Sequence, residues 1–235
     1  MSTLKDDFPI LKDITKISTL EYIAKKFDLN LFQRDMPIEI EKINRTIMAK
    51  TLYELGLIVG AEIGTAQGYH AELLCKNIPG VELYCVDVWQ PYAGYIEYVD
   101  RIDRYFIEAK TRLAKYDTHI IQKLSMDAVH DFEDNSLDFV YIDGAHDFKN
   151  VAMDLCEWSK KVRPGGVVFG HDYKRNARPR KPRFVVHVKD VVQAYMYSHD
   201  IKPWFALGGK SRHSDGMFNE GGQSWMFVRQ EGDAI

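Results

Sequence analysis

The sequence predicts an α/β fold: a doubly wound, mostly parallel seven-stranded sheet with a C-terminal antiparallel hairpin and a helical N-terminal extension. From residue 57 onward, short apolar runs alternate with helical patterns. Strands that alternate with helices indicate βαβ units. In such a unit the crossover helix carries the chain back, so that the two strands run parallel. The last two apolar runs have no helical pattern between them, which indicates a hairpin at the edge of the sheet.

The individual elements follow from local periodicity and turn chemistry. Strands are expected at 57–63, 81–86, 119–121, 137–142, 167–169, 204–207 and 224–228. Helices are expected at 69–77, 95–115 and 185–198, and around 151–158, where Val151, Leu155 and Trp158 recur at helical spacing. The turn at 163–166 (Arg-Pro-Gly-Gly) ends that last helix and starts the fifth strand.

The first 56 residues show helical patterns, over 20–27 and 38–55, and no strand pattern. We expect a helical cap or oligomerisation element over 1–56, followed by one domain over 57–235. A chain of 235 residues can bury a core large enough to fold without disulfides or a structural metal. The sequence leaves open whether the protein is a homo-oligomer.

Composition excludes several classes of protein. A net charge of -3 is unlike that of proteins that coat duplex nucleic acid. No apolar run approaches the roughly 18 residues that a membrane span needs. The three cysteines form no CxxC pair, and the N-terminus shows no secretory signal. We therefore expect a cytoplasmic protein with no membrane partner.

A glycine-containing loop follows the first expected strand, with the sequence Glu62-Ile63-Gly64-Thr65-Ala66-Gln67-Gly68. Glycines here let the backbone approach a ligand closely, and the next helix offers free N–H groups. The middle glycine that a dinucleotide loop needs is replaced by Ala66. Glu62 would repel phosphate and attract an ammonium group, so the loop favours an amino-acid-like ligand.

Polar residues follow the next two strands as well. Asp87, at the tip of the second strand, is placed to accept both ribose hydroxyls of a nucleoside. Trp89 either stacks on a base or belongs to the core. Asp127, after the third strand, either accepts a hydrogen bond from an exocyclic amine or caps a helix N-terminus.

Taken in order, these motifs resemble those of the class I S-adenosylmethionine-dependent methyltransferases, which have a Rossmann-like fold. The resemblance covers roughly 57–229 and is nearest to the branch of small-molecule and sugar O-methyltransferases with IDG-x-H and PGG…DY motifs. The motifs are Glu62-x-Gly64-x-x-x-Gly68, Asp87-Val88-Trp89, Ile142-Asp143-Gly144-Ala145-His146 and Pro164-Gly165-Gly166…His171-Asp172-Tyr173. The sequence departs from the family at Ala66, where a glycine is common, and at His171, where relatives often have an acid.

The resemblance implies a role for each matching residue. Residues expected around the methionine part of S-adenosylmethionine are Glu62, Gly64, Thr65 and Gly68. Asp87 would hold the ribose, with Trp89 beside it; Met126 and Asp127 would flank the adenine; and Asp143 would lie near the methyl donor.

Four candidate catalytic residues lie at the carboxyl ends of the fourth and fifth strands: Asp143, His146, His171 and Asp172. A sulfonium methyl is already electrophilic, so the protein must align donor and acceptor and remove a proton from a hydroxyl. His146 or His171 is a suitable base at neutral pH, and the sequence does not choose between them. Alternatively, Asp143 and Asp172 hold Mg²⁺ or another divalent cation that lowers the pKa of the acceptor.

A basic segment, 174–183, follows the fifth strand and carries six basic residues and no acid. Its arginines, Arg175, Arg178, Arg180 and Arg183, suit an anionic acceptor such as a nucleotide-linked sugar, although a merely solvated loop is an equal alternative. Nucleic acid is disfavoured, because no aromatic platform accompanies the charge.

The predicted function is therefore methyl transfer from S-adenosylmethionine to a hydroxyl of a small acceptor. Two alternatives remain. A nicotinamide-dependent oxidoreductase uses a similar scaffold, but Ala66 and Glu62 disfavour it. A non-catalytic cofactor-binding scaffold protein is disfavoured by the intact Asp143, His146 and Asp172.

Overall fold

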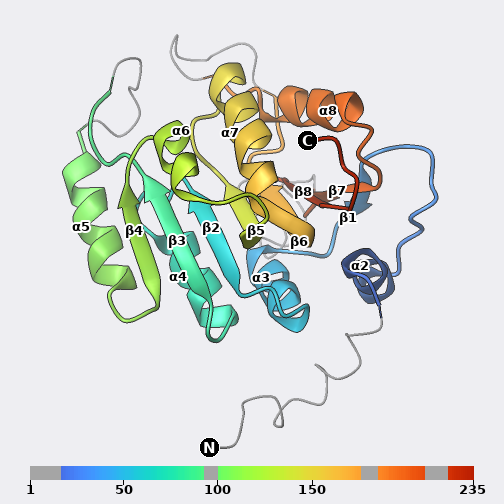
Figure 1. The fold of residues 1–235 in the computed structure, drawn as a ribbon, viewed down its shortest axis with the longest axis horizontal. Helices are drawn as coiled ribbons and strands as arrows, with labels where there is room; N and C mark the ends of the chain where they lie inside the picture. Colours follow the sequence, from blue (N-terminus) through green and yellow to red (C-terminus); the bar gives the residue numbers. More distant parts are fainter. Residues whose placement is uncertain (1–16, 93–99, 176–184, 210–221) are drawn as a thin grey trace, which may run out of the picture.

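The computed structural model describes residues 17–92, 100–175, 185–209 and 222–235. It is a central sheet with helices on both faces (Figure 1). The strands are β1 (Ile38–Ile40), β2 (Val59–Ile63), β3 (Glu82–Asp87), β4 (Thr118–Gln122), β5 (Leu137–Ile142), β6 (Val162–Gly170), β7 (Trp204–Leu207) and β8 (Ser224–Val228). The helices are α2 (Thr19–Phe27), α3 (Arg45–Glu54), α4 (Tyr69–Asn77), α5 (Ile102–Leu113), α6 (Ser125–Ala128), α7 (Phe148–Lys161) and α8 (Val188–Ser198), with a 3₁₀ turn, η1, at Val129–Asp131.

The strand order is β1-β7-β8-β6-β5-β2-β3-β4. All neighbouring pairs are parallel except those of β8, which runs antiparallel to both β6 and β7. The predicted α/β class, the mostly parallel sheet and the C-terminal hairpin are confirmed. Because the strand order reverses between the parallel strands β2 and β5, the carboxyl ends of these central strands open onto a crevice where ligands bind in such sheets.

The N-terminal segment holds the main correction to the predicted fold. The sheet has eight strands among the described residues, not seven, because Ile38–Ile40 forms β1 and pairs in parallel with β7. The helix predicted over 38–55 is therefore wrong at its start, and α3 begins only at Arg45. Isoleucines at positions 38 and 40 alternate as in a strand, but three residues are too short a stretch to predict one, and pairing with the edge of β7 decides the structure. The hairpin consequently does not lie at the sheet edge, which β1 occupies.

Other boundaries differ by smaller amounts. The helix predicted at 95–115 is observed as α5, from Ile102 to Leu113, and residues 93–99 lie outside the described part of the chain. The predicted Arg-Pro-Gly-Gly turn does end α7, at Lys161, but its residues already belong to β6. The fifth strand therefore starts at Val162, five residues earlier than predicted.

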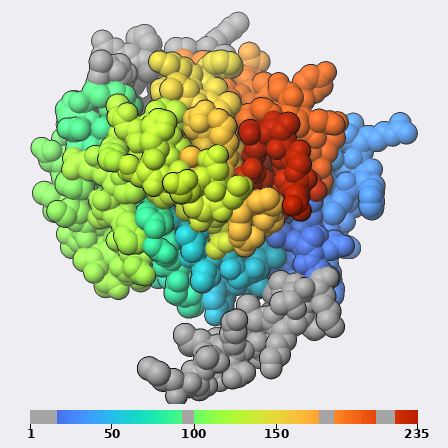
Figure 2. All heavy atoms as spheres, in the orientation of Figure 1, coloured from blue at the N-terminus to red at the C-terminus, as the bar shows by residue number. Residues whose placement is uncertain are grey.

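Alternation along the strands sends side chains to two separate core layers. Val140 and Val168 pack with α7 and α8 on one face, whereas Phe139 and Phe169 pack with α2, α3 and α4 on the other. Figure 2 shows the first face, where α6, α7, α8 and the red C-terminal residues cover the sheet. Helices thus cover both faces of the sheet, and ligands have access at the carboxyl ends of the strands.

One close backbone contact fixes the crevice. The Gly64 N–H donates to the Val86 carbonyl (2.9 Å), and the Asp143 N–H donates to the Ile63 carbonyl (2.8 Å). At φ +92°, Gly64 leaves no space for a side chain, since a Cβ there would lie 2.3 Å from the Asp143 carbonyl oxygen. The glycine predicted after the first strand is therefore required by the approach of β5.

Candidate active site

A cavity of about 640 Å³ lies at the carboxyl ends of β2, β3, β5 and β6. That volume is within the usual range for sites that hold a cofactor or a small molecule. The residues singled out from the sequence that line it are Gly64, Asp87, Trp89, Met126, Asp143, His146, His171 and Asp172. Four others, Glu62, Thr65, Gly68 and Asp127, are not among its lining residues.

Asp87, the last residue of β3, forms part of the cavity wall at the ends of β2 and β3. Its Oδ2 accepts a hydrogen bond from the Ala66 N–H (2.8 Å), and its Oδ1 accepts one from the Trp89 N–H (3.3 Å). Burial raises the pKa of Asp87, although these backbone donors oppose the shift. Each oxygen keeps a second lone pair, so the carboxylate can still accept hydrogen bonds from a ligand in the cavity.

Glu62 occupies a different place from the loop glycines. Its side chain is 1% exposed, and its Oε1 lies 2.8 Å from His70 Nδ1 on α4. Burial raises the pKa of Glu62 to about 8. The group is therefore held inside the protein against His70 and does not face the cavity.

Trp89 has features of both alternatives considered for it. It is 4% exposed, and its Nε1–H donates to the Ala66 carbonyl (2.8 Å), so the indole is a fixed part of the core. It also lines the cavity. Asp127 lies inside α6, whose N-cap is Leu124, so the N-cap interpretation is wrong.

Three predicted residues meet at the other end of the cavity. His146 Nε2 lies 3.0 Å from Asp172 Oδ2 and 3.6 Å from Asp143 Oδ1. Burial opposes a charged imidazole, but the contacts with the two carboxylates outweigh it and raise the pKa of His146 to about 10. One ligand atom from each of the three residues lies within 4.8 Å of the others, a spacing that a metal ion could bridge. We call Asp143, His146 and Asp172 the carboxylate–histidine cluster.

Asp172 also contacts two groups outside this cluster. Its Oδ1 lies 3.2 Å from His171 Nδ1 and 2.5 Å from Lys174 Nζ. Burial alone would raise the pKa of Asp172, but hydrogen bonds from His146, His171 and Lys174 hold it well below its usual range. His171 is 8% exposed, and its Nε2 has no hydrogen-bond partner among the described residues.

The cavity wall includes residues that the sequence did not single out. Asp154 of α7 accepts a hydrogen bond from Ser125 Oγ (2.5 Å), which in turn accepts one from Trp158 Nε1 (2.8 Å). Burial raises the pKa of Asp154 to about 7. The only sequence signal was an acid on the apolar face of a predicted helix, near Val151 and Leu155.

The predicted basic segment is described only in part. Arg175 forms an ion pair with Asp190 of α8, with Nε 3.0 Å from Oδ2. Arg178, Arg180 and Arg183 lie outside the described residues.

Comparison with known proteins agrees with this geometry. Residues 61–173 match a protein family described as a methyltransferase domain, and this stretch contains Gly64, Asp87, Asp143 and Asp172. The fold is that of a methyltransferase domain. The match does not favour the nicotinamide oxidoreductase alternative.

Solved structures with the same fold differ in what they act on. An O-methyltransferase from Bacillus cereus, in complex with S-adenosylhomocysteine, is 17% identical; the match covers 97% of this chain and 94% of that one, with a TM-score of 0.53. An rRNA methylase from Streptococcus thermophilus is 11% identical over 81% of this chain and 99% of that one, with a TM-score of 0.55. At these identities the likeness establishes the fold alone.

A sequence relative extends the comparison only slightly. The protein y4gI of Sinorhizobium fredii is 28% identical over 117 residues, which is 47% of this chain but 12% of the relative. The chain therefore spans a small part of that protein. No helix among the described residues is long and apolar enough to cross a membrane.

Proposed function

We propose that the chain is an S-adenosylmethionine-dependent O-methyltransferase with a small hydroxyl-bearing acceptor. The observation that carries the proposal is the single cavity that joins Gly64 and Asp87 at one end to the carboxylate–histidine cluster at the other. A cofactor cradle and a set of acid–base groups thus share one cavity. Methyl transfer to a hydroxyl needs this pairing, since donor and acceptor must be aligned and a proton removed.

The cofactor would lie along the β2–β3 wall. Gly64 lets the methionine part of the cofactor lie close to the backbone. Asp87 accepts hydrogen bonds from the ribose hydroxyls, and Trp89 packs against the purine. Met126 of α6 and Asp154 of α7 line the same cavity. Asp143, next to Gly64, would then stand near the methyl group that is transferred.

His171 is the better candidate for the base. Asp172 lies against its Nδ1, which fixes the ring and leaves Nε2 to accept a proton inside the cavity. His146 instead has two carboxylates beside it and a pKa raised to about 10, so it carries a proton at neutral pH. In this mechanism His171 Nε2 would take the proton of the acceptor hydroxyl, while S-adenosylmethionine would supply the methyl group by loss of its S–C bond and leave as S-adenosylhomocysteine.

The carboxylate–histidine cluster also fits a divalent cation. Asp172 Oδ1 is taken by His171 and Lys174, while its Oδ2 faces His146 and Asp143 and is available as a ligand. The ion would have to displace the proton of His146, after which a mixed oxygen and nitrogen set suits a transition metal better than Mg²⁺. When bound, such an ion would lower the pKa of an acceptor hydroxyl.

The acceptor is proposed to be anionic, as the basic segment suggests. Among the arginines of this segment, Arg175 already forms an ion pair with Asp190 of α8, so part of its positive charge is neutralised there. We also propose a cytoplasmic location and a nucleotide-linked sugar as one such anionic acceptor.

Calorimetric titration tests the proposal directly. S-adenosylhomocysteine should bind with a micromolar or lower Kd, whereas NAD⁺ should not bind. Asp87→Asn should weaken S-adenosylhomocysteine by about 10-fold, the scale of a lost charge-assisted hydrogen bond. Binding of NAD⁺ in preference would refute a methyltransferase and restore the oxidoreductase.

A further inference from the structure

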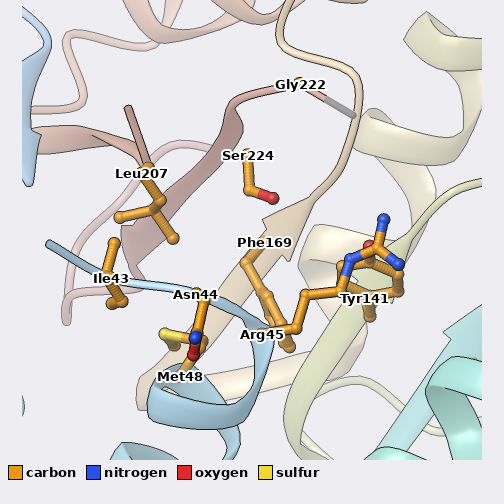
Figure 3. Close-up of a pocket in the computed structure, with 10 residues that line it drawn as sticks. Ile43, Asn44, Arg45, Met48, Tyr141, Phe169, Leu207, Gly222 and Ser224 are labelled. Atoms are coloured by element: carbon orange, nitrogen blue, oxygen red, sulfur yellow. The ribbon is translucent and has the colours of Figure 1, made fainter. Parts of the chain in front are cut away.

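A second, smaller hollow lies on the α3 side of the sheet, near the ends of β5 and β6 (Figure 3). Its volume of about 20 Å³ is room for one or two water-sized groups. It is lined by Ile43, Asn44, Arg45, Met48, Tyr141, Phe169, Leu207, Gly208, Gly222 and Ser224. The site described above uses none of these residues.

The buried carboxyl of Glu62 interacts electrostatically with Arg45, but Glu62 does not line this hollow. Among the residues that line it, Arg45 is the only charged one, and there is no carboxylate. Figure 3 shows the Arg45 side chain leaving α3 and passing Phe169 to place its guanidinium beside Tyr141. Arg45 is also the first residue of α3, whose N-terminal end favours negative charge.

Tyr141 supplies an independent sign of a missing ligand. The residue is 1% exposed, yet its hydroxyl has no hydrogen-bond partner among the described residues. Buried hydroxyls nearly always have such a partner, because burying one without a hydrogen bond costs its lost hydration. Ser224 of β8 presents a further hydroxyl to the same hollow (Figure 3).

The hollow adjoins the catalytic end of the large cavity. Gly222 lines the hollow, and a Cβ at Gly222 would lie 3.6 Å from Asp172 Oδ1. Asp172 in turn lines the large cavity. A ligand whose hydroxyl lies near Asp172 and His171 could therefore extend one small group past Gly222 toward Arg45.

We propose that this hollow binds a carboxylate of the methyl acceptor, with Arg45 as its anchor and Tyr141 and Ser224 as hydroxyl donors. The inference rests on the proposed methyltransferase function and narrows the acceptor to hydroxy acids. The planar guanidinium fork matches a carboxylate, and the volume admits a group of that size more readily than a phosphate.

Acetate and acetamide are the probes for the hollow itself, since they share a shape and differ in charge. Both are titrated into the full-length protein loaded with S-adenosylhomocysteine, and the Arg45 Nε–H resonance is followed by NMR. Acetate should shift it saturably and bind about 10-fold or more tightly than acetamide, as expected for a charge-assisted pair. No saturable shift with acetate, or equal shifts with both probes, overturns the proposal.

Substitutions test which residues produce the preference for acetate. Arg45→Gln should remove the preference for acetate, and Tyr141→Phe, which deletes only the hydroxyl, should weaken acetate about threefold to tenfold. In Tyr141→Phe the Arg45 resonance remains observable; for Arg45→Gln the ring resonances of Tyr141 are followed instead. Arg104→Gln is the matched control, because Arg104 is an exposed arginine on α5 paired with Glu108. An acetate preference that survives in Arg45→Gln contradicts the assignment.

The cofactor separates failure of this inference from failure of the proposed function. If S-adenosylhomocysteine does not bind the wild-type protein, the methyltransferase proposal fails, whatever acetate does. If it binds equally to wild type, Arg45→Gln and Tyr141→Phe but acetate shows no preference, only the carboxylate site fails. Retained cofactor binding also shows that the variants are folded.

Discussion

Asp172 joins the parts of the proposed catalytic centre. It contacts His146 through one oxygen and both His171 and Lys174 through the other. These contacts distinguish His146 from His171, the two candidate bases between which the sequence could not choose. One is clamped between carboxylates, and the other keeps a ring nitrogen without a protein partner among the described residues.

Replacing the proposed base should lower turnover without affecting cofactor binding. His171→Asn is expected to reduce kcat by about 10²- to 10⁴-fold, the usual contribution of a general base. Activity is measured as S-adenosylhomocysteine release with a hydroxy-acid acceptor, and cofactor affinity by calorimetry. His130→Asn, on the exposed turn η1, is the control. A wild-type kcat in His171→Asn would show that another group is the general base.

Gly64 offers a test of the close contact between β2 and β5. Gly64→Ala should lower the free energy of unfolding by about 3 kcal/mol or more, because the new Cβ meets the Asp143 carbonyl and the backbone has φ +92°. Gly80→Ala is the matched control, since it has φ +77° but nothing within 4 Å, and should cost about 1 kcal/mol. Urea unfolding measures both. Equal losses would show that φ alone matters.

Several residues of the site were predictable one at a time. Gly64, Asp87 and Asp143 stand at strand ends, where a motif in the sequence marks them. Arg45 and Tyr141 carried no such mark, because an arginine at a helix start and a tyrosine in a strand are ordinary. Their proximity arises from packing of α3 beneath β5.

Among the elements, α6 and α7 are joined by a buried polar link. Ser125 of α6 bridges Asp154 and Trp158 of α7. A carboxyl buried here binds its proton more tightly in the folded protein than in the unfolded chain, because burial raises its pKa to about 7 from 3.8. The folded state is thus favoured when Asp154 is protonated.

This link makes stability depend on pH in a stated direction. The stabilising contribution of Asp154 is complete below its unfolded pKa and is lost as pH rises through about 7. The wild type should therefore lose more free energy of unfolding between pH 5 and pH 8 than Asp154→Asn, by urea unfolding. Asp131→Asn, at an exposed carboxylate paired with Lys123, should keep the wild-type slope. Identical slopes for wild type and Asp154→Asn would disprove the shift.

Elements with long periodic patterns were predicted well, and short ones were not. The helix predicted at 69–77 and the strand predicted at 137–142 match α4 and β5. The strand β1, with three residues, was missed, because its pattern is too short to carry a period and its formation depends on the exposed edge of β7.

At the scale of the whole molecule, the N-terminal segment belongs to the main core. Ile38 and Ile40 of β1 are 3% and 4% exposed and share one apolar layer with α4, β3 and β8. The described part of the segment expected as a helical cap or oligomerisation element therefore packs against the sheet as part of one body.

A core substitution in β1 should therefore destabilise the entire fold. Ile40→Ala is expected to cost about 2–4 kcal/mol in a single transition, by the loss of buried apolar contacts. Far-UV circular dichroism and tryptophan fluorescence should give one midpoint, because Trp225 lies in the same sheet, in β8. Glu41→Ala, at an exposed neighbour, is the control. Two separate midpoints would indicate an independently folding extension.

The sequence by itself determined the α/β class, the parallel order of its central strands and the residues at their carboxyl ends. These features depend on local periodicity and on chain direction, which a sequence carries. Only the tertiary structure decided that Glu62 turns to His70, that His146 and His171 meet different oxygens of Asp172, and that Arg45 reaches Tyr141. Such contacts join residues far apart in the chain, and their geometry is set by how helices pack on the two faces of the sheet.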